Sequence, residues 1–227
     1  MQSMTIIYLI RHGEADGNAL GIFQGSSDTE LSEKGRRQLD YLAERCKSLH
    51  FDAIYSSPLK RAMGTAMGAN RFYNLPILIE RDLREIDVGQ FEGNTWDYIG
   101  KHFPDAFDSW KNDLANFVSP GGETLRDVYN RTWAAMLRIV KANPNRTVAV
   151  VSHGCAIKTL LCHAHGWPVE RVMEVPWTDN TSISRIDFDD KLRPTLVFAN
   201  DTDHLPEDMK PRTWRAWDQV PAKGDRQ

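Results

Sequence analysis

The stretch YLIRHGEADGN, residues 8–18, decides the fold of this chain. It starts inside an apolar run, TIIYLI at residues 5–10, which stops abruptly on Arg11, His12 and Gly13. An apolar run rich in β-branched residues, without strict alternation, is typical of a strand covered on both faces. The glycine that follows suits a tight turn. The sequence therefore predicts a buried strand that carries an arginine and a histidine to its end.

Two later segments repeat this order of strand, polar turn and helix. FDAIYSSP at residues 51–58 precedes a helix predicted over residues 59–72, and TVAVVSHG at residues 147–154 precedes a helix predicted over residues 155–165. The serine and proline that end the first of these turns suit the cap and the first position of the helix that follows. Alternation of strands and helices is typical of an α/β fold.

The remaining periodic segments complete the pattern. Ser32 suits the cap of a helix with an apolar stripe, and a second amphipathic helix is predicted over residues 123–140. Two further strands are predicted over residues 182–188 and 195–199. We expect an α/β three-layer sandwich, with a mostly parallel central sheet flanked by helices and a helical cap insertion.

Length and composition bound the function. The 227 residues suffice for a single domain, expected to span residues 1–227. The charge is balanced, with 28 Lys and Arg against 31 Asp and Glu, which does not favour nucleic-acid binding. Three cysteines without framework spacing indicate a reducing compartment, and no apolar run is long enough for a signal sequence or a membrane span. We therefore expect a cytoplasmic protein that binds neither nucleic acid nor membranes.

Cationic and imidazole side chains follow the ends of the three predicted strands. Arg11 and His12 end the first, Arg61 lies in the helix after the second, and His153 ends the third. In open α/β sheets, ligands bind outside the carboxyl ends of the strands, so these side chains are expected to converge. Arginine forks and helix N-termini both favour phosphate. The sequence therefore predicts an anion site at this edge of the sheet.

Several sequence motifs around these residues resemble those of a known protein family. Arg11-His12-Gly13-Glu14 resembles the signature of the histidine phosphatase superfamily, which has the phosphoglycerate mutase-like fold. Supporting motifs follow in the family's order over most of the chain. They are Asn18, QGSSDTELSEKG at residues 24–35, SSPLKRAMGTA at residues 56–66, LREIDVGQFEG at residues 83–93, and SHG at residues 152–154.

The resemblance implies a role for each cationic group. His12 would be the nucleophile, attacking phosphorus to give a phosphohistidine, for which its ring must be neutral. Its unperturbed pKa of about 6.5 leaves it mostly neutral at pH 7, and the neighbouring Arg11 and Arg61 are expected to lower that pKa further. Arg11, Arg61 and His153 would hold the phosphoryl oxygens in the transition state. No metal and no cofactor is implied.

Four further positions complete the site that the resemblance implies. Asn18 matches a phosphate ligand of the family, and Gln24 matches a residue near the substrate. The N–H groups of the helix that begins beside Gly154 would donate to the phosphoryl group. Glu85 would protonate the leaving oxygen and later take a proton from the hydrolytic water. An incoming phosphate dianion favours the protonated acid by like-charge repulsion.

A metal site is the alternative for the helix after the third strand. Cys155, Cys162, His163 and His165 lie close together there. Their spacing spreads the side chains around one helix and fits none of the usual zinc patterns. We interpret the thiols as core residues.

Three functions compete within this resemblance. The first is a histidine acid-type phosphatase, a phosphoric monoester hydrolase similar to the α-ribazole phosphatases and their broad-specificity relatives. The second is a cofactor-dependent phosphoglycerate mutase, and the third is a non-catalytic binder of phosphorylated ligands. The binder is disfavoured because each catalytic position holds a competent residue type. The mutase is disfavoured because Val88 stands where mutases typically carry tyrosine, and because Lys111 is the single basic residue of residues 110–117, where mutases carry a basic pair.

The segment over about residues 91–122 is expected to be the cap. It is rich in aromatic residues, most of which we interpret as packing residues, with the remainder lining a pocket for the leaving group. The expected partner is therefore a small-molecule phosphomonoester with a neutral, partly apolar leaving group. The C-terminal tail, about residues 206–227, would dock either on the domain or on a second copy of the chain, so a homodimer stays open.

Overall fold

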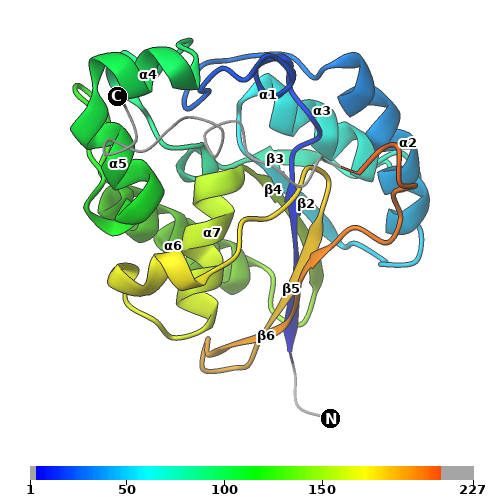
Figure 1. The fold of residues 1–227 in the computed structure, drawn as a ribbon. Coiled ribbons are helices and arrows are strands. Elements are labelled where there is room, and N and C mark those ends of the chain that lie inside the picture. Colours follow the sequence, from blue (N-terminus) through cyan, green and yellow to red (C-terminus); the bar gives the residue numbers. More distant parts are fainter. Residues whose placement is uncertain (1–3, 211–227) are drawn as a thin grey trace.

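A six-stranded sheet forms the centre of the structure, a computed structural model that describes residues 4–210 (Figure 1). The strand order is β3-β2-β4-β1-β5-β6. The first four strands of that order are parallel to one another. Strand β5 is antiparallel to both of its neighbours, β1 and β6. The strands are β1 (Thr5–Arg11), β2 (Ala53–Ser56), β3 (Ile77–Ile79), β4 (Thr147–Ser152), β5 (Ile183–Phe188) and β6 (Pro194–Asp201). The predicted mostly parallel sheet is confirmed.

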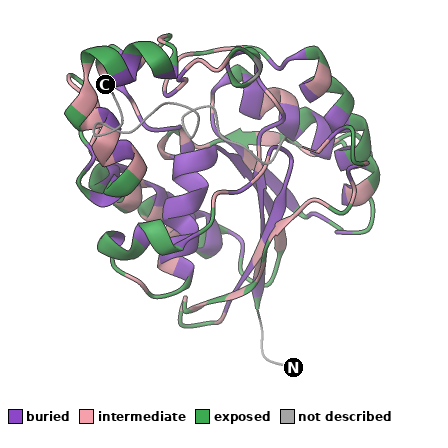
Figure 2. Ribbon diagram, in the orientation of Figure 1, coloured by how far each residue is buried: buried purple, intermediate pink, exposed green. Residues whose placement is uncertain are grey.

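Helices cover both faces of this sheet. Figure 1 shows α2 (Glu33–Cys46) and α3 (Lys60–Ala69) on one side, and α6 (Leu125–Ala142) and α7 (Gly154–Ala164) on the other. The central strands and α7 are largely buried, as Figure 2 shows. The three-layer α/β prediction is therefore confirmed.

Alternate residues of β1 pack against the helices on opposite faces of the sheet. Ile7 and Leu9 pack in the hydrophobic cluster that includes residues of α6 and α7, whereas Tyr8 and Ile10 pack in the cluster that includes residues of α2 and α3. Because side chains alternate across a strand, burial on both faces requires a continuous apolar run. This explains why TIIYLI lacks the polar–apolar alternation of a half-exposed strand.

The predicted helix boundaries need one correction. Ser32 caps α2 as predicted, its side chain accepting a hydrogen bond from the N–H of Gly35. The helix predicted over residues 59–72 is shorter: α3 begins at Lys60, two residues beyond Pro58, and ends at Ala69. The Ser57 hydroxyl accepts from the N–H of Leu59 at 3.4 Å, and Asp28, from a distant loop, accepts from the N–H of Lys60 at 2.7 Å.

Strand β3 was not predicted. It has three residues, pairs only with β2 and lies at the edge of the sheet with exposed side chains. A segment this short, without burial on both faces, carries too little periodicity to be recognised. The boundaries of the other strands lie within two residues of the predicted ones.

Short helices form the cap and the connections. Around the cap, α4 (Trp96–His102) and α5 (Pro104–Asn112) lie beyond one end of the sheet (Figure 1). The other short elements are α1 (Asp16–Leu20), η1 (Arg81–Leu83), η2 (Gly89–Phe91), η3 (Leu114–Asn116) and η4 (Val169–Glu174). Division of the chain into a domain, a cap and a tail stays a prediction, and the tail residues 211–227 lie outside the described residues.

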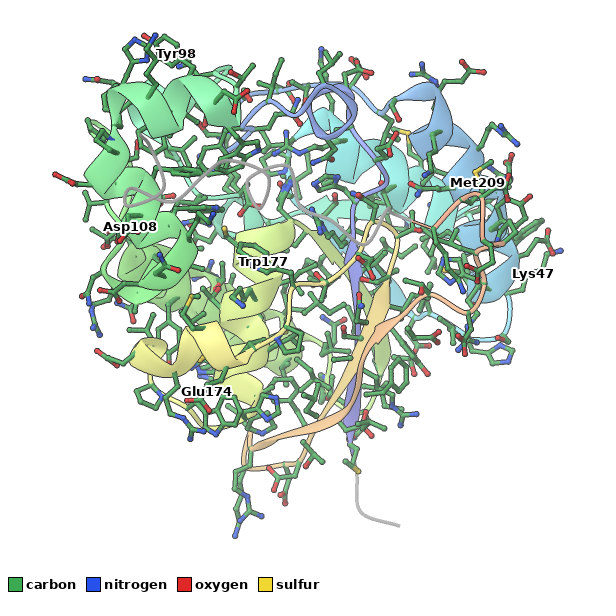
Figure 3. The ribbon with its side chains drawn as sticks, viewed as in Figure 1. Lys47, Tyr98, Asp108, Glu174, Trp177 and Met209 are labelled. Atoms are coloured by element: carbon green, nitrogen blue, oxygen red, sulfur yellow. The ribbon has the colours of Figure 1, made fainter. Side chains whose placement is uncertain are left out.

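The cap aromatics pack into the same hydrophobic cluster as residues of β1, α6 and α7. The ring centroid of Phe23 lies 4.2 Å from that of Trp96 and 4.6 Å from that of Trp110, and Phe91 and Phe117 pack beside them. Tyr98 is instead exposed, and Figure 3 shows its side chain on the outer side of α4, pointing away from the rest of the protein. These contacts agree with the interpretation of most cap aromatics as packing residues. Within residues 4–210, no helix is both long enough and apolar enough to cross a membrane.

Candidate active site

Parallel pairing brings the predicted strand ends together. Arg11 lies opposite Ser152 in the β1–β4 register, so the residues that follow them, His12 and His153, leave the sheet side by side. The N–H of His12 donates to the carbonyl of Ser152 at 3.0 Å. The two imidazole centroids are 5.1 Å apart. The convergence of these two histidines at the carboxyl edge of the sheet follows from this topology.

His12 is held in one tautomer. Its ring is buried, with 4% of its surface exposed, and Nδ1 lies 2.7 Å from the carbonyl oxygen of Gly13. A carbonyl oxygen only accepts hydrogen bonds, so Nδ1 carries the proton and Nε2 keeps its lone pair in the neutral ring. Burial, followed by the charges of Arg61 and Arg11, holds the pKa of His12 well below its ordinary value of 6.5. The ring is therefore neutral at physiological pH.

Hydrogen bonds from two distant segments of the chain hold the backbone around His12. The Asn180 side chain donates to the carbonyl of His12 at 2.9 Å, and the N–H of Thr181 donates to the carbonyls of Arg11 and His12. The N–H of Gly13 donates to the hydroxyl of Thr65 on α3 at 3.0 Å. These contacts come from two elements far apart in sequence, so the imidazole has a rigid base.

His153 is buried beside a serine hydroxyl. Its Nε2 lies 2.7 Å from the hydroxyl of Ser57, the residue predicted to cap α3. Burial, followed by the charges of Arg61 and Arg11, holds the pKa of His153 well below 6.5. Its Nδ1 has no hydrogen-bond partner among residues 4–210, and the same is true of Nε of the buried Arg61. A buried polar group without a partner costs about 1–3 kcal/mol, which an anionic ligand that accepts from both would recover.

The Arg61 guanidinium is held by a loop. It is 1% exposed and donates to the carbonyl oxygens of Ser27, at 2.6 Å, and Gly25, at 2.7 Å. Glu92 in turn accepts from the N–H groups of Gly25, Ser26 and Ser27. A side chain at position 25 would bring a Cβ within 2.2 Å of the Ile86 carbonyl, so only glycine fits there. Glu92 thus shapes the loop that orients Arg61.

Arg11 and Trp177 approach the start of α7. The Arg11 guanidinium donates to the carbonyl of Thr178. A Cβ added to Gly154 would lie 3.5 Å from Glu85 Oε2, 3.5 Å from the Trp177 ring and 3.6 Å from Arg11 Cζ. Figure 3 shows Trp177 beside α7. The position of Gly154 is therefore the point where the carboxylate, the guanidinium and an aromatic surface meet.

Glu85 occupies the N-terminus of α7. Its carboxylate is 8% exposed and accepts hydrogen bonds from the N–H groups of Cys155, at 3.1 Å, and Ala156, at 3.3 Å. It also accepts from the N–H of Ile86 at 3.0 Å. Asp28 and Glu85 thus accept from N–H groups at the N-termini of α3 and α7. The role of these N–H groups and of Gly154 toward the phosphoryl group stays a prediction.

Asn18 and Gln24 lie on the short segment between β1 and α2. Asn18 is exposed, and its Oδ1 accepts from the N–H of Ala15, the residue before α1, at 3.1 Å. Gln24 is half-buried and packs against Gly17, where a Cβ would lie 2.0 Å from Gln24 Nε2. Their contact with a phosphoryl group stays a prediction.

Three contributors to the site were not recognised from the sequence. The sequence predicts Ser57 as a helix cap, places Glu92 in a motif without indicating its role, and carries no signal for Thr178. Each acts through a contact between segments distant in the chain: a hydroxyl on His153, a carboxylate on a loop, and a carbonyl on Arg11. A single sequence carries no local signal for such contacts.

The alternative metal cluster is not assembled. Residues 4–210 contain no group of three or more histidine, cysteine or acidic side chains that could hold a metal ion. Cys155 and Cys162 are free thiols in the hydrophobic core, as the sequence interpretation has it. His163 stacks on Tyr129, with ring centroids 3.6 Å apart, and burial lowers the pKa of His163 to about 4.

The two site histidines predict a loss of stability in mild acid. Above pH about 6.5, His12 and His153 are neutral in both the folded and the unfolded chain and contribute no pH dependence. Below that pH, the unfolded chain takes up protons that the folded site resists, because both pKa values are lowered. Each histidine therefore reduces the free energy of unfolding by up to about 1.4 kcal/mol per pH unit as the pH falls.

The measurement is urea unfolding between about pH 7 and pH 5 for the wild type and His12→Gln. We expect the free energy of unfolding to fall less steeply in the variant, since one of the resisting groups has been removed. Equal slopes in the two proteins would mean that His12 titrates in the folded state as it does in the unfolded chain.

Known proteins are similar to this chain in sequence and in fold. The sequence profile of the histidine phosphatase superfamily (branch 1) matches residues 7–202. Phosphoserine phosphatase 1 of Hydrogenobacter thermophilus is 34% identical over 207 residues, 90% of this chain and 96% of the relative. Phosphoglycerate mutase-like protein 4 of Arabidopsis thaliana is 34% identical over 204 residues, 88% of this chain and 87% of the relative.

A solved structure agrees with the sequence relatives. Bacillus stearothermophilus YhfR superposes with a TM-score of 0.84 at 33% identity, covering 88% of this chain and 98% of that structure. The match of the family profile extends over most of the chain and includes both site histidines, Arg11, Arg61 and Glu85. The chain therefore belongs to the histidine phosphatase superfamily, branch 1.

Proposed function

We propose that this protein is a phosphomonoesterase that hydrolyses a small-molecule phosphate ester through a phosphohistidine intermediate. The observation that carries the proposal is the fixed tautomer of His12, whose Nδ1 faces the carbonyl of Gly13. Nε2 is thereby the nitrogen with a lone pair, and the lowered pKa keeps that lone pair available at neutral pH. Arg11, Arg61 and His153 supply the donors for a phosphoryl group beside it.

The reaction has two displacement steps. In the first, the lone pair of His12 Nε2 attacks phosphorus and the bond from phosphorus to the ester oxygen breaks. The leaving oxygen takes a proton from the protonated form of Glu85 and departs as an alcohol. In the second, water attacks the phosphohistidine, Glu85 takes its proton, and the P–N electron pair returns to Nε2. The products are an alcohol and inorganic phosphate.

The protein's own cationic side chains can supply the positive charge that this displacement needs. A phosphoryl transition state spreads negative charge over its equatorial oxygens, and pre-oriented donors stabilise it. Arg61 is buried and held by two carbonyls, so its guanidinium needs no reorganisation when phosphate binds. We accordingly propose a reaction that uses no metal and no cofactor, in the cytoplasm, where the free thiols of the core stay reduced.

The leaving group is proposed to be neutral and partly apolar. The carboxylate of Glu85 marks the leaving-group side, and the Trp177 ring lies beside it at the start of α7. Apolar surface buried against such a ring contributes about 25 cal/mol per Å². A second anionic group placed there without a partner would be desolvated at a cost of several kcal/mol, roughly 2–7 for a polar group.

A phosphoglycerate mutase is the second candidate, since relatives of comparable similarity carry mutase names. Two positions speak against it. Val88, where mutases typically carry tyrosine, is fully buried in the core. Lys111, the single basic residue of its stretch, lies with its Nζ 5.5 Å from the Phe107 ring centroid. A phosphoserine phosphatase is a further version of the phosphatase candidate, favoured by the relative that carries this name, but its leaving group would be charged rather than neutral.

The purified chain tests these alternatives on one panel of substrates. We expect hydrolysis of 4-nitrophenyl phosphate and of an alkyl phosphate with phosphate release, unchanged by a chelator. Isomerisation of 3-phosphoglycerate is expected to be slower by a factor of at least about 100, a difference of about 2.7 kcal/mol. Phosphoserine belongs on the panel as the named relative's substrate. Fast isomerisation would identify a mutase, and binding of phosphate without turnover of any ester would identify a non-catalytic binder.

A further inference from the structure

An ion pair on α6 lies against the segment that carries Glu85. Glu123 precedes α6, and Arg131 lies two turns into the helix. Arg131 Nε donates to one Glu123 oxygen at 2.9 Å, and its Nη2 donates to the other at 2.9 Å. The side chains are 13% and 25% exposed, respectively. A two-point contact of this kind fixes the orientation of a guanidinium as well as its position.

The same guanidinium binds the backbone that leads to Glu85. Arg131 donates to the carbonyl oxygens of Asp82, at 2.7 Å, and Arg84, at 2.8 Å. A third bond, of 3.0 Å, reaches the carbonyl of Glu85 itself. Three carbonyls that no regular helix or strand uses are therefore satisfied by one side chain.

Glu123 fixes the other side of the catalytic carboxylate. It accepts from the N–H of Asp87 at 3.0 Å through its side chain, and its own N–H donates to the Asp87 carbonyl at 2.8 Å. The backbone is thereby held on both sides of Glu85, from residue 82 to residue 87. Between these anchors the Glu85 side chain reaches the N–H groups of Cys155 and Ala156 on α7.

We propose that the Glu123–Arg131 pair positions Glu85 for proton transfer to the leaving group. Arg131 and Glu123 act through the backbone of Glu85, so they are positioning residues. This inference rests on the proposed function, in which Glu85 exchanges the proton. A general acid must lie within hydrogen-bond reach of the leaving oxygen, so a small shift of residues 82–87 impairs protonation before it impairs phosphate binding.

The chain offers a matched control on the same helix. Arg138 lies two turns beyond Arg131 and contacts the same segment, but it donates only to the side chains of Glu80, at 3.0 Å, and Asp82, at 2.7 Å. Its side chain is 52% exposed. Arg138→Met removes an ion pair to this segment and leaves the backbone carbonyls with Arg131, whereas Arg131→Met removes the backbone contacts.

The first experiment compares kcat and KM of the two variants on an alkyl phosphate and on 4-nitrophenyl phosphate. For Arg131→Met, we expect kcat on the alkyl ester to fall by about 10–100-fold, with a fall of less than about 3-fold on the nitrophenyl ester, whose leaving group needs little protonation. KM should stay within about 2-fold, because the phosphoryl ligands are untouched. Arg138→Met should match the wild type on both esters. Glu123→Gln, which keeps an acceptor for the Asp87 N–H, should give the same pattern as Arg131→Met at smaller amplitude.

The second experiment needs no turnover. The first N–H groups of a helix have no partner inside that helix, so exchange protection of the Cys155 and Ala156 amides reports directly on the Glu85 carboxylate. We expect this protection to fall at least about 10-fold in Arg131→Met and to be unchanged in Arg138→Met. A wild type without esterase activity would refute the proposed function, while the exchange comparison would still test the positioning. Unchanged protection in Arg131→Met, or equal losses on both esters, would overturn the inference.

Discussion

Replacing His12 with alanine is expected to lower phosphomonoester hydrolysis by about 10⁴-fold or more, the order of magnitude typical for loss of an enzyme's nucleophile. The reason lies in the geometry of the ring. The bond of Nδ1 to the Gly13 carbonyl leaves Nε2 as the attacking atom, and burial with two arginines keeps the ring neutral. We do not expect the nearby His153 to take over this role: with Nε2 accepting from the Ser57 hydroxyl, Nδ1 carries the proton, so neither nitrogen keeps a free lone pair.

Trapping of the intermediate makes the prediction specific to His12. Turnover of ³²P-labelled substrate, quenched in alkaline detergent, should leave a phosphoprotein that is stable in base and labile in acid. His12→Ala should abolish the label, whereas the exposed His102→Ala variant should retain it. His153→Ala should slow the reaction and still form the label, since His153 is proposed to hold the phosphoryl oxygens. A label that persists in His12→Ala would place the nucleophile elsewhere.

Much of the fold could be predicted because burial on both faces leaves a continuous apolar run. Strands β1 and β4 carry such runs, and their shared register brings His12 and His153 together. The edge strand β3 could not be predicted, because three half-exposed residues carry no such constraint. The start of α3 lies one residue later than predicted, and Asp28, from a distant loop, accepts from its first N–H. Local capping rules cannot anticipate a partner that arrives through tertiary structure.

The residues of the site also fall into those that could be predicted from the sequence and those that could not. Residues at strand ends could be predicted, since their position follows from the topology of a parallel sheet. Residues that act through another residue could not. Arg131 is one more cation on an amphipathic helix until η1 packs against α6, and Glu92 becomes an anchor only when residues 25–27 fold over it. The sequence therefore indicates which groups could react with phosphate, and the structure adds how those groups are held.

Glu85→Gln is expected to have the second largest effect, and the effect should depend on the leaving group. Glutamine keeps one oxygen that can accept from the α7 N-terminus, where the two Glu85 oxygens accept from Cys155 and Ala156, but its amide has no acidic proton to transfer. An alkoxide leaves reluctantly without protonation, so hydrolysis of an alkyl phosphate should fall by about 10²–10⁴-fold. Nitrophenolate is a weak base and leaves unaided, so hydrolysis of 4-nitrophenyl phosphate should fall by less than about 10-fold.

Glu92→Gln supplies the contrast, because it makes the same chemical change in a carboxylate that acts on the other side of the site. Glu92 holds the loop whose carbonyls orient Arg61, so its loss should weaken the grip on the phosphoryl group whatever the leaving group is. Both esters should then slow by the same factor, which steady-state kcat/KM on the two substrates measures directly. If Glu85→Gln also slows both esters equally, Glu85 orients the substrate and another group protonates the leaving oxygen. A leaving-group dependence confined to Glu85→Gln would instead separate proton transfer from phosphoryl binding and assign each to its own carboxylate.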